Sequence, residues 1–233
     1  MIPKIAHMIW IGWEMPRFQK KILEKNKVIL ATQWFIIKVW DNNKLTLAQF
    51  YTPWWVLKSI LDWRYALATD YYRIKLIQRY WGIYIDCDHE LIKPIPEYIL
   101  ESDFVCWKMP QWYIANSFFG ASKENKLLNF IEAKISHEVT LLNYIDFPRV
   151  EALFLFAEII EDQQEKVLLL DSEYLYPFFP GIKSTGITDK TFAISWYTYT
   201  WTSNKILRFC NYFWLQRLAL FIRKFNFLFK NDD

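Results

Sequence analysis

The sequence predicts an α/β fold that begins with a parallel βαβ unit and ends in a basic, aromatic C-terminal helix. Segments with strand character alternate with helical patterns, and a strand, a helix and a second strand follow one another within the first forty residues. That succession is typical of a βαβ unit with parallel strands and a right-handed crossover. A length of 233 residues and a hydrophobic fraction of 53% fit one folded domain with a large core.

The N-terminal residues supply this βαβ unit. Ile2–Gly12 is expected to be a buried strand, Arg17–Thr32 a helix with a basic exposed face, and Trp34–Trp40 a second strand. Trp10 lies at the C-terminal end of the first strand, where open α/β sheets bind ligands, although packing in the core would explain it equally well. His7, alone on the same apolar strand, is expected to be packed and not catalytic.

Two helical patterns come next. Leu45–Leu61 is predicted to be helical with a break before Pro53, because the residue ahead of a proline avoids the helical region. Asp62–Trp81 is the clearest helix, and Asp70 and Arg73 are i, i+3 neighbours within its otherwise apolar stripe. The pair is either an ion pair on the surface or part of a functional site, and spacing alone does not decide between them.

The next strand leads directly into two aspartates. Gly82 is expected to cap the preceding helix, and Ile83–Asp86 has strand character. Because alternate strand residues share a face, Tyr84, Asp86 and Asp88 should point one way while the isoleucines between them enter the core. Two carboxylates at a strand end suit Mg²⁺ or Mn²⁺, which prefer oxygen ligands and often hold a substrate diphosphate. The alternative is a polar turn with solvated aspartates, since Asp-x-Asp is a common tripeptide.

The remaining elements are assigned from apolar runs and turn residues. They are an extended edge segment at 91–96, strands at Asp103–Met109, Ser117–Ala121 and Val167–Asp171, and helices at Asn125–His137 and Pro148–Ile160. Phe178–Lys190 directly follows Pro177 and contains one proline and two glycines. A loop so late in an α/β chain is a candidate lid over a site.

Residues 205–230 contain basic and aromatic side chains but no acidic residue, and the first acidic residue after them is Asp232. Such a helix is too charged to span a bilayer but is suited to the headgroup region of an anionic membrane. The alternative is a helix that packs on the domain with its arginines extended to solvent. We favour the membrane surface, and therefore divide the chain into a domain of residues 1–204 and a membrane-associating segment of residues 205–233.

Bulk properties argue against several other classes of protein. The net charge is +3 with no basic block before the C-terminus, which argues against a dedicated nucleic-acid binder. Cys87, Cys106 and Cys210 have neither paired nor metal-ligand spacing, so we expect no disulfide framework and a reducing cytoplasm. The first residues lack the pattern of a signal peptide, and no stretch has the length of uncharged residues that a transmembrane helix needs.

Taken together and in order, these motifs resemble the glycosyltransferases of the DXD sugar-binding type, family 32, and more remotely the glucosylating domain of clostridial toxins. Residues 2–12 and 37–41 look like the first two strands of that family. Ala68–Arg73 is similar to its small-residue–Asp–x–x–Arg helix, and Gly82–Asp88 is similar to its Gly-x-Tyr-x-Asp-x-Asp strand. Weaker matches at 116–120, 148–149 and 173–177 extend the likeness over residues 2–201.

The resemblance implies a fold of the GT-A kind, a Rossmann-like mixed sheet flanked by helices. Residues 1–204 would form this nucleotide-sugar-binding catalytic domain. It implies that Trp10 stacks on the nucleotide base and that Tyr84 helps to form the nucleotide pocket. By the same resemblance, Asp70 and Arg73 would hold hydroxyl groups of the ribose and the donor sugar. The donor would be a UDP-hexose, with GDP-mannose as the alternative.

The resemblance also implies a metal centre. Asp86 would contact both ribose and metal, and Asp88 would ligate Mn²⁺ or Mg²⁺, so these two are the candidate catalytic residues. A bound metal neutralises charge on the departing diphosphate and acts as a Lewis acid. Many members carry a histidine in a segment similar to 193–201, where this chain has Ser195 or Trp196, so Ser195 is the candidate third ligand. A second departure is Trp81, which stands where the family usually has the first of two glycines.

These expectations lead to one main hypothesis and two alternatives. The main hypothesis is a metal-dependent, retaining hexosyltransferase that acts at the cytoplasmic face of the membrane on a lipid-linked glycan or a surface polysaccharide such as lipopolysaccharide or capsule. No carboxylate stands out as a nucleophile, so we expect same-face attack by the acceptor hydroxyl. The alternatives are a phosphohydrolase of the haloacid dehalogenase type, with Asp86 as nucleophile, and a catalytically inactive glycosyltransferase-like membrane partner. The oligomeric state is left open.

Overall fold

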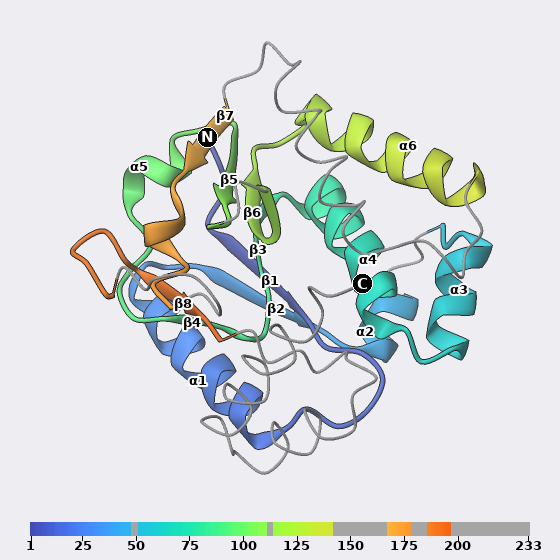
Figure 1. The fold of residues 1–233 in the computed structure, drawn as a ribbon, viewed down its shortest axis with the longest axis horizontal. Coiled ribbons are helices and arrows are strands. Elements are labelled where there is room, and N and C mark those ends of the chain that lie inside the picture. Colours follow the sequence, from blue (N-terminus) through green and yellow to red (C-terminus); the bar gives the residue numbers. More distant parts are fainter. Residues whose placement is uncertain (48–50, 111–113, 142–166, 179–185, 197–233) are drawn as a thin grey trace, which may run out of the picture.

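The computed structural model describes residues 1–47, 51–110, 114–141, 167–178 and 186–196 (Figure 1). Within them, six strands form one sheet in the order β2-β1-β3-β6-β5-β7, and a second sheet pairs β4 with β8. The strands are β1 (Ile5–Ile9), β2 (Ile36–Trp40), β3 (Gly82–Ile85), β4 (His89–Leu91), β5 (Phe104–Lys108), β6 (Ile114–Ala121), β7 (Val167–Leu170) and β8 (Ala193–Ser195). The expected mixed sheet is confirmed, because β6 runs antiparallel to both of its neighbours while β1 is parallel to β2 and to β3.

Helices pack on both faces of this sheet (Figure 1). One apolar cluster joins one face of the sheet to α3, α4 and α6, and the other joins the opposite face to α1 and α5. The helices are α1 (Arg17–Thr32), α2 (Asn42–Leu47), α3 (Trp54–Leu61), α4 (Tyr65–Tyr80), α5 (Glu97–Leu100) and α6 (Lys126–Leu141), with a 3₁₀ turn η1 (Ser172–Tyr174).

The strand order creates a switch point beside β1. The chain passes from β1 through α1 to β2 on one side, and β3 is then added on the other side of β1. Parallel strands whose connections leave in opposite directions open a crevice beyond their carboxyl ends, where α/β proteins bind ligands. Trp10 follows β1 and Asp86 follows β3, so both residues lie at this edge of the sheet.

Most expected elements have the predicted type, helix or strand, but several begin or end at other residues than predicted. The helix Arg17–Thr32 is confirmed over its full length, and the break before Pro53 separates α2 from α3. The first strand is shorter than Ile2–Gly12, and the strand expected from Ser117 begins earlier, at Ile114. The short elements α5 and β8 were not predicted, because three or four residues carry too little periodicity.

The helix before β3 ends differently from the expectation. Gly82 was expected to cap α4, but the capping residue is Trp81, with φ of 57°, and Gly82 is the first residue of β3, with φ of 93°. A Cβ atom on Gly82 would lie 2.2 Å from the carbonyl oxygen of Ile5. Glycine is therefore required here for close approach to β1 as well as for its backbone angle.

Strand β3 is buried on both faces. Ile83 and Ile85 belong to the cluster on the α1 side, as the alternation predicted, whereas Tyr84 belongs to the cluster on the α4 side. All three have 0% exposure. The expected alternation is thus correct, but both sets of side chains enter the core, as in sheets that helices cover on both sides.

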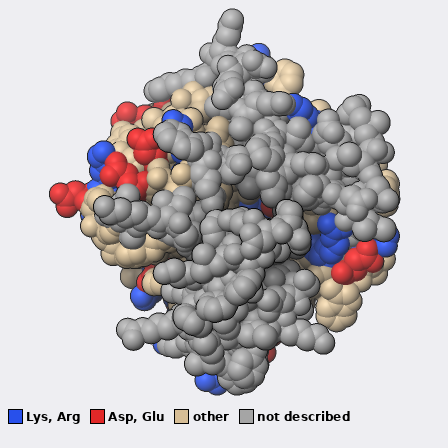
Figure 2. Space-filling model, in the orientation of Figure 1, with Lys and Arg blue, Asp and Glu red and all other residues tan. Residues whose placement is uncertain are grey.

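Several expectations fall on residues outside the described ranges. They are the helix Pro148–Ile160, the central part of the candidate lid Phe178–Lys190, and the basic segment 205–233 with the domain division that rests on it. Among the described residues, no helix combines the length and apolar character needed to cross a bilayer. In the described surface of the face shown in Figure 2, acidic and basic side chains are interspersed.

Candidate active site

The turn after β3 holds both aspartates at the sheet edge. The strand ends at Ile85, so Asp88 lies in the turn and not on an extension of the strand. The backbone N–H of Asp86 donates to the carbonyl oxygen of Ser117 at 2.9 Å, and the thiol of Cys87 donates to the carbonyl oxygen of Ile9 at 3.3 Å. These bonds connect the turn to β6 on one side and to the end of β1 on the other.

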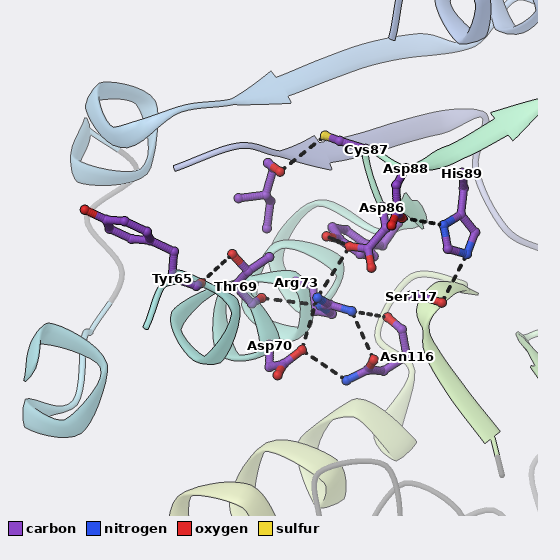
Figure 3. A network of polar contacts seen from close by, with 12 residues as sticks. Tyr65, Thr69, Asp70, Arg73, Asp86, Cys87, Asp88, His89, Asn116 and Ser117 are labelled. Atoms are coloured by element: carbon purple, nitrogen blue, oxygen red, sulfur yellow. Dashed lines mark hydrogen bonds and ion pairs between the residues drawn. The ribbon is translucent and has the colours of Figure 1, made fainter. Parts of the chain in front are cut away.

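Arg73 is the centre of the polar network at this edge (Figure 3). Its Nη2 lies 3.0 Å from Oδ1 of Asp70 and 3.4 Å from Oδ1 of Asp86. Its Nη1 donates to the carbonyl oxygen and to Oδ1 of Asn116, at 2.8 and 3.0 Å. The Arg73 side chain is 6% exposed, so the surface ion pair considered from the sequence is wrong, and the pair is part of a buried network.

Tyr84 and Asn116 complete the surroundings of this arginine. The Tyr84 hydroxyl donates to Oδ1 of Asp86 at 2.5 Å, and the Arg73 guanidinium lies 4.8 Å from the centre of the Tyr84 ring. Nδ2 of Asn116 donates to Oδ1 of Asp70 at 3.3 Å. The network therefore joins α4, β3 and β6, and it holds Asp86 from two directions.

Burial sets the charge states of these groups. Desolvation raises the pKa of Asp86, and the repulsion from Asp88 adds to it, whereas Arg73 lowers it. Burial also raises the pKa of Tyr84, so its hydroxyl keeps the proton that it donates. For Arg73, burial acts to lower the pKa, but the nearby acidic groups outweigh it and the guanidinium stays charged.

A group of potential metal ligands lies beside this network. Oxygen atoms of Asp86 and Asp88 and a ring nitrogen of His89 lie within 4.8 Å of one another. The carboxylate side chains are 27% and 22% exposed, so the solvated turn considered from the sequence does not describe them. Two carboxylates are a donor set that fits Mg²⁺ or Mn²⁺, since these ions prefer oxygen ligands.

Ser195 is brought to the same place by the second sheet. Its strand, β8, pairs antiparallel with β4 so that Ser195 stands opposite His89. The next residue, Trp196, donates its backbone N–H to the carbonyl oxygen of Asp88 at 3.0 Å and its indole N–H to Glu90 at 2.8 Å. Ser195 therefore lies opposite His89 and directly before the residue that bonds to the backbone of Asp88. Its role as a ligand stays a prediction.

Trp10 lies at the same edge but outside the Arg73 network. Its backbone N–H donates to the carbonyl oxygen of Trp40 at 2.9 Å and its indole N–H to that of Trp13 at 2.8 Å, and the ring is partly buried. The Cys87–Ile9 bond brings the aspartate turn next to it. Its proposed stacking on a nucleotide base stays a prediction.

Sequence reasoning assigned no role to His89, Asn116, Ser117 or Tyr176, although the last three fall within the weaker family matches. The hydroxyl of Tyr176 joins the site because it lies 3.0 Å from that of Ser117. Asn116 and Ser117 lie on β6, and only the pairing of β6 with β3 places them opposite the aspartate turn. The histidine that follows the Asp-x-Asp tripeptide was a signal in the sequence that could have suggested a further polar contact.

Comparison with known proteins supports the interpretation of the motifs. Residues 19–105 match the family model described as "Glycosyltransferase sugar-binding region containing DXD motif", a range that holds Asp70, Arg73, Tyr84 and both aspartates of the turn. No curated protein sequence matches the chain.

Two solved structures were also compared with the chain. One is described as a glycosyltransferase involved in the glycosylation of the major capsid of PBCV-1; at 13% identity it covers 90% of this chain and 99% of its own, with a TM-score of 0.53. The other, described as PaToxG Glycosyltransferase, is 18% identical over 68% of this chain and 69% of its own, with a TM-score of 0.46. The first comparison confirms the expected glycosyltransferase type of fold.

Proposed function

Because the chain is a glycosyltransferase with a DXD region, we propose that it transfers a hexose from a nucleotide diphosphate sugar to a glycan in a metal-dependent reaction that retains the anomeric configuration. UDP-hexose is the favoured donor and GDP-mannose the alternative. The observation that carries this proposal is the buried contact of Arg73 with both Asp70 and Asp86, directly beside Asp88. A buried cation between two carboxylates fixes polar groups where hydroxyl groups of a donor sugar would be bound.

Each residue of the site has a role in this proposal. Asp88 and Asp86 would hold the metal, which when bound neutralises the charge on the leaving diphosphate. Asp70 accepts, and Arg73 donates, hydrogen bonds to hydroxyl groups of the ribose and the sugar. Tyr84 keeps Asp86 in place, because its buried hydroxyl remains protonated and donates to that carboxylate.

The proposed transfer step needs no enzyme nucleophile. The bond between the anomeric carbon and the diphosphate oxygen breaks while the acceptor hydroxyl oxygen bonds to the same face of that carbon. The proton of the acceptor hydroxyl passes to the departing diphosphate. Preorganised charges at the site stabilise the negative charge that develops on this leaving group.

We propose that the acceptor is a lipid-linked glycan or a growing surface polysaccharide at the inner face of the cytoplasmic membrane. The support is the sequence of residues 205–230, whose basic and aromatic composition suits an anionic lipid surface. Binding to vesicles with and without anionic lipid tests this part, using the full chain and a variant with Arg208, Arg217, Arg223 and Lys224 changed to Gln. Equal binding of both proteins would contradict it.

Donor hydrolysis tests the enzymatic part. The protein with Mn²⁺ is incubated with a panel of nucleotide sugars, and release of free sugar and nucleotide is measured. We expect turnover with a UDP-hexose, its loss in Asp88→Ala, and its retention in Asp62→Asn, a change in a half-exposed surface pair with Lys58. Metal-dependent UDP binding without turnover on any donor or acceptor would instead favour the catalytically inactive partner.

A further inference from the structure

The side chain of His89 is buried next to Asp88. This side chain is 2% exposed, and its ring lies near the rings of Phe118 and Tyr176, with centroid distances of 6.4 and 6.2 Å. The side chain of Asn26 on α1 holds the strand that carries it, because it donates to the carbonyl oxygen of His89 at 2.7 Å and accepts from the backbone N–H of Leu91 at 2.8 Å. Aromatic neighbours and the hydrogen bonds of its backbone therefore hold this ring in place.

Both ring nitrogens have partners in this position. Nδ1 lies 3.1 Å from Oδ1 of Asp88, and Nε2 lies 3.1 Å from the hydroxyl oxygen of Ser117 (Figure 3). The Ser117 hydroxyl in turn lies 3.0 Å from the hydroxyl of Tyr176. Four side chains from three parts of the chain thus form one continuous row of hydrogen bonds that ends on a carboxylate.

The carboxylate fixes the direction of this row. An ionised aspartate only accepts hydrogen bonds, so the bond at Nδ1 requires a hydrogen on that nitrogen. In a neutral ring, Nε2 then accepts from Ser117, and Ser117 can accept from Tyr176. A protonated Nδ1 has no lone pair for a metal, and Nε2 faces Ser117.

From this arrangement, and resting on the proposed function, we propose that His89 is a positioning residue that orients the metal-binding carboxylate of Asp88 and is not itself a metal ligand. In the group of Asp86, Asp88 and His89, the two aspartates would then be metal ligands and His89 would orient Asp88. A support of this kind acts by holding Oδ1 of Asp88, which fixes the orientation of the carboxylate that would bind the metal. Loss of such outer contacts typically lowers metal affinity by roughly 10- to 100-fold.

Substitutions at position 89 distinguish a positioning role of His89 from a role as a metal ligand. An asparagine can place its amide N–H near the position of Nδ1, so His89→Asn keeps a donor for Asp88. A glutamine reaches instead toward the position of Nε2, so His89→Gln keeps a partner for Ser117 but loses the donor for Asp88. His89→Phe fills the space and loses both bonds. Mn²⁺ affinity is measured in the presence of UDP, and pulsed electron paramagnetic resonance detects nitrogen bound to the ion.

We expect Mn²⁺ to bind His89→Asn nearly as well as the wild type, and His89→Gln and His89→Phe roughly 10- to 100-fold more weakly. The Mn²⁺ spectrum should show no nitrogen coupling that depends on His89. Equal affinity in all variants, equal weakening in His89→Asn and His89→Gln, or a nitrogen coupling that disappears in His89→Phe would each overturn the inference. Thermal unfolding without metal tests whether each variant folds; if His89→Phe does not fold, the Asn and Gln variants decide. A wild type that binds no Mn²⁺ with UDP would overturn the proposed function.

Discussion

Arg73 and Asp86 meet at 3.4 Å between Nη2 and Oδ1, although they belong to a helix and to the turn after the next strand. The same nitrogen lies 3.0 Å from Asp70, so one buried guanidinium pairs with two carboxylates. This contact stabilises the fold and the site at once, because Asp86 is a candidate metal ligand. Both effects of the contact can be measured.

Replacing Arg73 by Met should lower the free energy of unfolding by about 3 to 5 kcal/mol, since it leaves two mostly buried carboxylates without their cation. Urea unfolding measures the change. Lys58→Met is the matched control: Lys58 pairs with Asp62 on the surface of α3 and is 49% exposed, so its loss should cost less than about 1 kcal/mol. Similar losses in the two variants would show that Arg73 is not the centre of a buried network.

Asn116 tests the hydrogen bonds around the same arginine. In Asn116→Asp, a carboxylate oxygen replaces the amide nitrogen that donates to Asp70, so two acceptors with like charge would face each other across 3.3 Å. We expect this change to weaken donor binding more than Asn116→Ala does, and to cost about 1 to 3 kcal/mol of stability. Titration of UDP binding in the presence of Mn²⁺ and urea unfolding measure the two effects. Equal behaviour of both variants would argue against the Asn116–Asp70 contact.

Gly82→Ala should strongly destabilise the protein, because the new Cβ would lie 2.2 Å from the carbonyl oxygen of Ile5 in the neighbouring strand. Gly186→Ala is the matched control, since Gly186 also has a positive φ, of 69°, but a Cβ added there would meet no atom within 4 Å. Backbone strain alone should cost about 1 kcal/mol in the control. Thermal unfolding should therefore show a much larger loss for Gly82→Ala, and equal losses would contradict the close approach of β3 to β1.

His7 should make stability depend on pH. Burial lowers its pKa from 6.5 to about 4, and a neutral ring can accept the indole N–H of Trp40 at Nδ1 while its Nε2 donates to the carbonyl oxygen of Trp81. Its folded pKa lies below its unfolded pKa, so the unfolded chain binds the proton first as the pH falls. Stability should be unaffected by His7 above pH 6.5 and decrease by about 3 kcal/mol as the pH falls to about 4.

The test of this dependence is urea unfolding between pH 7.5 and pH 4 for the wild type and for His7→Phe. The variant loses two hydrogen bonds, so it should be less stable at neutral pH. Its free energy of unfolding should nevertheless fall less steeply than that of the wild type between pH 6.5 and pH 4. The two slopes should differ by at most about 1.4 kcal/mol per pH unit, the value for one bound proton. Parallel curves for both proteins would contradict a neutral, buried His7.

Features that depend on interactions between residues close in the sequence could be predicted, whereas features that the surrounding tertiary structure imposes could not. The helix Arg17–Thr32 and the break at Pro53 depend on local periodicity and backbone chemistry, and both agree with the structure. The close pairing of Asp70 with Arg73 follows from helix geometry, and so was expected. The cap at Trp81 was not expected, since a tryptophan in the left-handed region is tolerated only where the surrounding structure imposes it.

The sequence by itself determined the alternation of strands and helices, the apolar strand that leads into two carboxylates, and the charged pair on the helix before it, because these are patterns within single elements. Only the tertiary structure decided that Arg73 contacts Asp86, that β6 brings Asn116 and Ser117 to the aspartates, and that His89 faces Asp88 with one nitrogen and Ser117 with the other. Those contacts depend on which strands pair and in which register, and a strand's own residues do not specify its neighbours.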